Sequence, residues 1–174
     1  ITEKIKVIED FELYTQGEII NQSKNTKGYA YMYGEHHKRR GNHAMSRGSE
    51  TGNNAGGDQD LNVNQGNICI ISEDLDSNDP DDNAKGGIFS YKYNEVVELN
   101  SFDIIDNEKK GGIYIIYFEN KEPKVFDLPT NGDNESSLVI INMEGVVGID
   151  IELKGSGAID NIVSTRTITR TEIK

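Results

Sequence analysis

Two apolar runs in the middle of the chain decide the fold class. Val97–Ile105 reads VELNSFDII and Gly112–Glu119 reads GIYIIYFE, with the turn residues Lys110-Gly111-Gly112 between them. Both runs are short, and both are rich in Ile, Val, Tyr and Phe. Apolar runs of this length that end at glycine, asparagine or aspartate are typical of β-strands.

The same pattern recurs on both sides of these two runs, and no stretch of 12 residues has a helical period. The further strands that it predicts are Ile5–Leu13, Gly28–Tyr33, Asn67–Glu73, Gly86–Tyr93, Lys124–Leu128, Ser137–Asn142, Val147–Lys154 and Ala158–Thr171. About ten short strands with this spacing predict an all-β chain. We expect a two-sheet antiparallel β-sandwich or jelly roll, formed as one domain by residues 1–174.

One long segment interrupts the strand pattern. Residues 35–66 contain no aromatic residue and are rich in Gly, Asn, Ser and charged side chains. A structureless connection of this length is unusual in a compact domain, so we expect a Gly/Asn-rich loop that is functional or held by a partner. The strands on either side are too few to form separate cores, so no domain boundary is expected there.

The charge of the chain narrows the choice of partner. The 174 residues include 30 acidic and 18 basic side chains, which gives a net charge of −12. Nucleic acid and anionic membrane are poor partners for such a chain, because phosphate contacts need Lys and Arg. No run of 18 apolar residues exists, so membrane insertion is not expected. Cys69 is the only cysteine and no intrachain disulfide is possible, so a bound cation is the expected staple.

The densest acidic segment is Glu73–Asp82, in which six of ten residues carry carboxylates. Oxygen ligands at this density suit Ca²⁺, which takes six to eight of them. The EF-hand spacing is absent, because with Asp74 at position 1 the sixth position is Asp79 and the twelfth is Lys85. A solvated acidic turn is the alternative. The candidate calcium ligands are Asp74, Asp76, Asp79, Asp81 and Asp82.

A second candidate lies inside the long segment. Asp58, Asp60, Asn62 and Asn64 alternate along the chain, and in an extended backbone alternate side chains lie on one side. We therefore consider Asp58, Asp60 and Asn62 as further Ca²⁺ ligands, with an ordinary polar loop as the alternative.

The third candidate calcium site combines two acidic segments, one near each end of the chain. Glu9-Asp10-Phe11-Glu12 stands near the start, and Gly157-Ala158-Ile159-Asp160-Asn161-Ile162 stands near the end. Together they resemble the calcium-bearing jelly rolls of many carbohydrate-binding modules, in which acidic residues of the first strand and an Asp of the last strand share a structural ion. The resemblance implies that Glu12 and Asp160 share a Ca²⁺.

A closer resemblance extends from about Ile8 to Ile162. It is to the secreted bacterial β-sandwich modules that often precede PEP-CTERM-type sorting anchors, and chain positions 28–47 depart from it. The resemblance implies extracellular export and a calcium requirement, without a defined activity. The motifs that carry it include Asp10-Phe11-Glu12, the Gly-Gly-Asp-x-Asp-Leu core at 56–61, Asp-Pro-Asp-Asp-Asn-Ala-Lys-Gly-Gly at 79–87, and Gly155-Ser156-Gly157-Ala158-Ile159-Asp160-Asn161-Ile162.

Three tyrosines alternate at Tyr29, Tyr31 and Tyr33, so they share one face of a strand. Rows of aromatic side chains bind sugar rings by stacking. They also fill cores and pack across strands. The sequence leaves both alternatives open, and the three residues are candidate ligand-binding residues.

No catalytic motif is present: there is no Gly-x-Ser-x-Gly, no Walker loop and no His-Glu-x-x-His, so an enzyme is not expected. Two functional classes remain. One is a secreted, calcium-stabilised module at the cell surface that binds an extracellular glycan. The other is a structural subunit of a calcium-dependent filament or layer, in which residues 1–7 or 165–174 add a strand to a neighbouring copy. The alternative for these termini is that both pair within their own domain.

Overall fold

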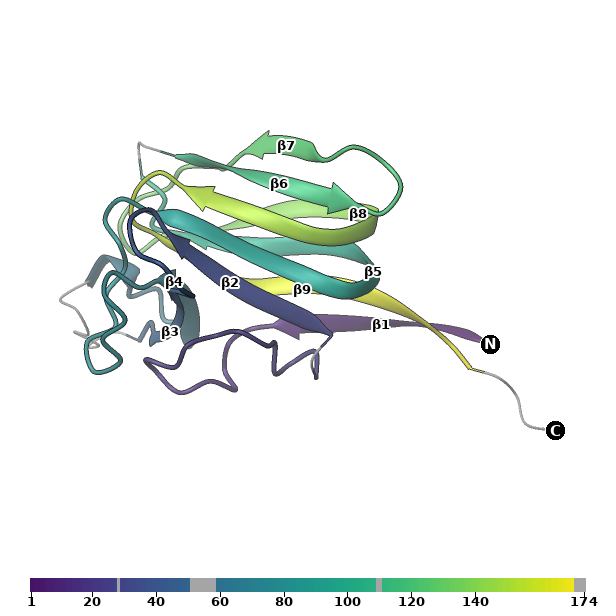
Figure 1. Cartoon of the computed structure of the whole chain (residues 1–174), viewed down its shortest axis with the longest axis horizontal. Helices are drawn as coiled ribbons and strands as arrows, with labels where there is room; N and C mark the ends of the chain where they lie inside the picture. The colour runs from purple at the N-terminus through teal and green to yellow at the C-terminus, as the bar shows by residue number, and fades with distance from the viewer. Residues whose placement is uncertain (28, 51–58, 109–110, 171–174) are drawn as a thin grey trace.

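The computed structural model describes residues 1–27, 29–50, 59–108 and 111–170, and it is an antiparallel β-sandwich, as the sequence predicts (Figure 1). No helix in these described ranges is long and apolar enough to cross a membrane. The elements are β1 (Thr2–Glu9), β2 (Ala30–His36), β3 (Ala44–Gly48), the 3₁₀ turn η2 (Gln59–Leu61), β4 (Asn67–Ile71), β5 (Gly87–Ile105), β6 (Gly112–Phe118), β7 (Lys124–Asp127), β8 (Ser136–Leu153) and β9 (Ala158–Thr169).

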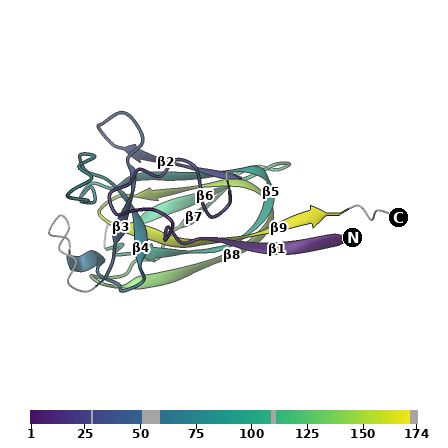
Figure 2. The ribbon, with the colours of Figure 1, turned by 90° about the horizontal axis from the view of Figure 1, so that it is seen from below.

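Two long strands, β5 and β8, take part in both layers of the sandwich (Figure 2). The first part of β5 pairs with β2 and with the last part of β8, which in turn pairs with β6. The last part of β5 pairs with β9 and with the first part of β8. Register shifts between Lys92 and Ser101 mark the place where β5 passes from one layer to the other. Bulges of this kind bend a strand and increase its twist, which lets one strand serve two sheets.

From the sequence, each of these long strands is expected as two. The predicted strands leave breaks at Asn94–Val96 and Met143–Val146, but the structure has continuous strands there. Gly145 has a φ of +73°, and Asn142 has a φ of +48°. The residue types that indicated turns are thus the ones that let the strand bend.

The predicted long loop at 35–66 is only partly a loop. Its middle contains β3, which pairs with β4 over Ala44–Gly48. Met45 of β3 packs in a small second core with Leu61 and Ile105. A strand of five residues with two buried apolar side chains is too short to show a period, so the pattern missed it.

The two terminal strands pair with each other inside the chain. β1 and β9 run antiparallel from Thr2 opposite Thr169 to Glu9 opposite Ile162. This ribbon extends away from the sandwich, and the N-terminus lies at its tip (Figure 1). The structure therefore shows the internal pairing that the sequence left open, and strand exchange with a neighbouring copy stays a prediction.

The main core lies between the two layers and follows the period of two along each strand. On β5, Phe89, Tyr91 and Phe102 face inward, whereas Ser90 and Lys92 face outward. Cys69 is fully buried in the same core, and burial raises the pKa of its thiol well above the usual value, as expected for an inert cysteine.

The close packing at the start of β5 gives a first test. Gly86 has a φ of +74°, and a Cβ placed on it would lie 2.0 Å from the carbonyl oxygen of Leu153. Gly145 has nearly the same φ, +73°, with no atom within 4 Å of an added Cβ. We expect Gly145→Ala to cost about 1 kcal/mol for the left-handed backbone alone, and Gly86→Ala to cost about 2 kcal/mol more. Urea denaturation of both variants measures this, and equal costs would contradict the packing described here.

Candidate functional site

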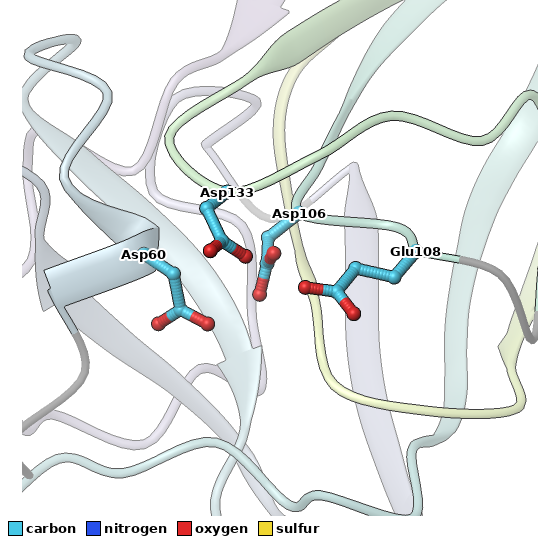
Figure 3. A group of neighbouring side chains, drawn as sticks. All are labelled: Asp60, Asp106, Glu108 and Asp133. Atoms are coloured by element: carbon cyan, nitrogen blue, oxygen red, sulfur yellow. The ribbon is translucent and has the colours of Figure 1, made fainter.

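Four carboxylates from three separate turns meet at the end of the sandwich where β5 ends (Figure 3). They belong to Asp60, Asp106, Glu108 and Asp133, and one oxygen from each lies within 4.8 Å of the others. Figure 3 shows the four side chains directed toward a common centre. In the part of the chain that the structure describes, no other group of three or more His, Cys, Asp or Glu side chains is this compact. We call these residues the acidic site.

Apolar neighbours fix the position of two of these acids. Leu61 follows Asp60 and Ile105 precedes Asp106, and both apolar side chains are fully buried in the small second core. Asp106 itself has a φ of +53°, which turns the chain sharply after the last residue of β5. Aspartate tolerates this left-handed conformation better than most residues.

The turn that carries Asp133 is tied to the other two turns by asparagines. The backbone N–H of Asn134 donates to the carbonyl oxygen of Asp60 at 2.7 Å, and its Nδ2 donates to the carbonyl oxygen of Asn62 at 3.1 Å. Asn131 Nδ2 donates to the carbonyl oxygen of Ile104 at 3.0 Å. These hydrogen bonds hold the three turns together and place the acids near one another.

Asp106 is the buried member of the acidic site. Its side chain is 0% exposed, and its Oδ2 accepts a hydrogen bond from Ser156 Oγ at 3.3 Å. Its Oδ1 is buried and has no hydrogen-bond partner among the described residues. Burial, and after it the negative charge of Asp60, raise the pKa of Asp106 to about 8. Such a group needs either a proton or a cation beside it.

The donor set fits calcium. Four carboxylates supply up to eight oxygens, and Ca²⁺ takes six to eight oxygen ligands in flexible geometry. Mg²⁺ demands a stricter octahedron and keeps most of its water, and Zn²⁺ is more often held by Cys and His. When bound, a calcium ion would neutralise Asp106 and cross-link the three turns.

The metal ligands that the sequence predicts do not lie together at one site in the structure. Asp60 is part of the acidic site, and Asn62 lies in the same turn with its Oδ1 buried and unpartnered among the described residues. Asp58 lies outside the described residues. None of the remaining predicted ligands belongs to the acidic site; these are Glu12, Asp74, Asp76, Asp79, Asp81, Asp82 and Asp160.

The acidic turn at Glu73–Asp82 faces mostly outward. Asp74 and Asp76 are exposed, and each accepts a backbone hydrogen bond from the residue two positions later. Asp82 is buried, and its Oδ2 accepts a hydrogen bond from the N–H of Gly157 at 2.8 Å. These contacts are those of a turn stabilised by its own side chains, and a calcium ion there stays a prediction.

Asp160 is fully buried but already has donors. Its Oδ2 accepts a hydrogen bond from Gln65 Nε2 at 2.7 Å, and its Oδ1 accepts one from the N–H of Asn161 at 2.8 Å. Burial nevertheless raises its pKa to about 8. Glu12 instead accepts a hydrogen bond from the N–H of Asn67. A calcium shared by Glu12 and Asp160 stays a prediction.

Three of the four acids were missed from sequence because each is isolated there. Asp106, Glu108 and Asp133 are far from Asp60 along the chain, and only the fold brings them together. Two weak signals were present: an Asp directly after an apolar strand at Asp106, and the turn sequence Gly132-Asp133-Asn134.

The tyrosine row lies on the outer face of β2. Tyr29, Tyr31 and Tyr33 are 41%, 43% and 47% exposed, so they do not fill the core. The guanidinium of Arg166 lies 3.6 Å from the ring centre of Tyr29 and covers that ring. Tyr31 and Tyr33 instead line a groove of about 530 Å³, with Asn21, Asn42, Ser90 and Lys92 on its walls. We call this the tyrosine groove.

Comparison with known proteins gives a distant likeness. No family model matches the chain, and no curated protein is similar to it. Among solved structures, a family 32 carbohydrate-binding module of C. perfringens NanJ in complex with galactose is 14% identical, with a TM-score of 0.40, covering 94% of this chain and 100% of that one. A mutant of the family 29 module CBM29-2 is also 14% identical, with a TM-score of 0.37, covering 96% and 93%. At this identity and TM-score, neither structure indicates which residues of this chain bind a ligand.

The acidic site predicts calcium-dependent stability. Ca²⁺ at a hundred times its dissociation constant should stabilise the native state by about 3 kcal/mol. For a chain of this length that raises Tm by about 6–12 °C. Asp106→Asn should remove most of this rise, whereas Asp76→Asn, an exposed acid outside the site, should leave it intact. Melting curves in excess chelator and in millimolar calcium measure the difference, and a rise that survives Asp106→Asn would exclude this site.

Asp160 predicts a pH dependence. Its pKa is raised to about 8 in the folded chain, against about 4 when unfolded, so the native state holds a proton that the unfolded state has lost between these values. The free energy of unfolding should therefore fall as pH rises from 4 to 8. Asp160→Asn should make this fall shallower, and Asp76→Asn should not. Urea midpoints at several pH values, in chelator, test this; an unchanged slope in Asp160→Asn would contradict the protonated assignment.

Proposed function

We propose that this chain is an extracellular, calcium-stabilised, non-catalytic module that binds carbohydrate in the tyrosine groove. The observation that carries the proposal is the pair of exposed rings, Tyr31 and Tyr33, on one face of a strand over a groove walled by amides and a hydroxyl. Sugar rings have apolar faces that stack on aromatic side chains and hydroxyls at their edges that bond to such groups. Sites of this kind combine aromatic walls with a few polar groups.

The acidic site supports the calcium part of the proposal. Asp106 keeps an oxygen buried without a donor among the described residues, next to three further carboxylates. Calcium sites of extracellular modules are weak and are filled at the high calcium concentration found outside cells. A staple of this kind suits a chain whose one cysteine is buried in the core.

The same burial speaks against a catalytic role for the acidic site. A pair such as Asp106 with its raised pKa and the nearby Asp60 is the electrostatic pattern of a general acid beside a charged partner. A catalytic acid must touch its substrate, however, and Asp106 is 0% exposed. A structural cation is therefore the better use of this group.

The internal pairing of the termini favours a binding module over a filament subunit. β1 already has β9 as its partner along its whole length. Exchange of β1 into the sheet of a neighbouring copy would first have to break this pairing.

The tyrosines give a matched test of the proposal. We expect wild-type protein to bind one or more polysaccharides on a glycan array. Tyr31→Ala and Tyr33→Ala should each weaken this binding about tenfold, because one lost ring contact is worth about 1.4 kcal/mol. Tyr29→Ala, directly before the strand and under Arg166, should have little effect.

Two results would count against the proposal. One is an array on which no glycan is bound. The other is equal loss in all three variants, which would show that strand stability and not the groove controls binding. The Tm of each variant, measured alongside, keeps these outcomes separate.

A further inference from the structure

The tyrosine groove is electrostatically unlike the rest of the chain. The protein carries 30 acidic residues and a net charge of −12, but none of the residues that line the groove is Asp or Glu. The charged residue on its wall is Lys92. The groove is thus a locally cationic spot on an anionic protein.

Lys92 lies beside Tyr31 and Tyr33 in the lining of the groove. It pairs with Tyr31 across β5 and β2, and its side chain is exposed. No described residue forms a hydrogen bond or a salt bridge with its ammonium group. On its other side it pairs with Gly148 of β8, where an added Cβ would lie 3.6 Å from Lys92 Cγ. Glycine there leaves the lysine stem uncovered.

Two acids lie next to the groove on the same face of the sheet. Asp150 pairs with Ser90, but its Oδ2 accepts a hydrogen bond from Tyr117 Oη at 2.8 Å. Tyr117 belongs to β6, which lies on the side of β8 away from β5, so that bond directs this oxygen of Asp150 toward β6. Glu35, two residues beyond Tyr33, lines a neighbouring hollow together with Glu152, Lys85 and Lys154. The ammonium of Lys92 is therefore left for a ligand.

We infer that the tyrosine groove selects an acidic sugar, whose negative group pairs with Lys92 while a ring of the same glycan stacks on Tyr31 or Tyr33. This inference rests on the proposed function and specifies its ligand class. A neutral glycan would leave the ammonium without a partner. An acidic one replaces water around both charges with a charge-assisted hydrogen bond, which is stronger than a neutral one.

The test compares two forms of one glycan that differ only in charge. Short oligogalacturonides carry a carboxylate on each ring, and their methyl esters are neutral with the same backbone. Titration calorimetry should show about tenfold tighter binding of the acid than of the ester by wild-type protein. Lys92→Gln should abolish this preference by weakening the binding of the acid more than that of the ester, and Lys92→Arg should retain it.

Lys85→Gln provides the control, since it makes the same charge change outside the tyrosine groove. A preference lost equally in Lys85→Gln and Lys92→Gln would reflect net charge alone and would overturn the inference. A second arm with dextran sulfate and dextran distinguishes a sulfate from a carboxylate as the negative group. A preference for either acidic form that depends on Lys92 supports the inference.

The remaining outcomes separate the two proposals. If neutral glycans bind as tightly as acidic ones and Tyr31→Ala weakens both, the groove binds carbohydrate but the inferred selectivity is wrong. If neither acidic nor neutral glycans bind, the proposed function fails together with the inference.

Discussion

The structure depends on two strands that each belong to both layers of the sandwich. β5 and β8 pair with each other for most of their length, and the outer strands attach to one end or the other of this pair. Their bends set the angle between the layers and enclose the main core. Both candidate sites follow from this arrangement. The tyrosine groove lies where the first part of β5 meets β2, and the acidic site lies where β5 ends.

The acidic site concentrates a conflict that folding alone does not resolve. Burying a carboxylate that has one oxygen without a donor is costly, and placing three more carboxylates around it increases the cost. The fold nevertheless holds them there through buried Leu61 and Ile105 and through the hydrogen bonds of Asn131 and Asn134. A proton on Asp106 relieves part of the conflict, whereas a calcium ion would offset two of the four negative charges, give the unpartnered oxygen of Asp106 a ligand bond and link three turns. The ion would thus serve the role that disulfides serve in many extracellular domains.

Much of the sandwich could be predicted from the sequence, because strands that face a core on one side alternate in polarity. The same rule placed Tyr31 and Tyr33 on one face of β2, although it could not decide whether that face was inside or outside. The pattern failed at Asn142 and Gly145, where residues typical of turns allow a long strand to bend. It also missed β3, whose few residues carry no period. The local density of acidic residues in the sequence did not indicate the acidic site: the crowded acids at Glu73–Asp82 face mostly solvent, whereas Asp106, which stands outside any such cluster, is buried. Side chains that converge only through tertiary structure leave no periodic signal in a single sequence.

The most direct test of the central claim, a calcium ion in the acidic site, is a structure from crystals grown in calcium. An anomalous difference map is calculated from data collected at a long wavelength. The account predicts a strong peak about 2.4 Å from carboxylate oxygens of Asp60, Asp106, Glu108 and Asp133, with six to eight oxygens around it. An acidic site without a peak in saturating calcium, or peaks confined to the turn at Glu73–Asp82, would contradict it.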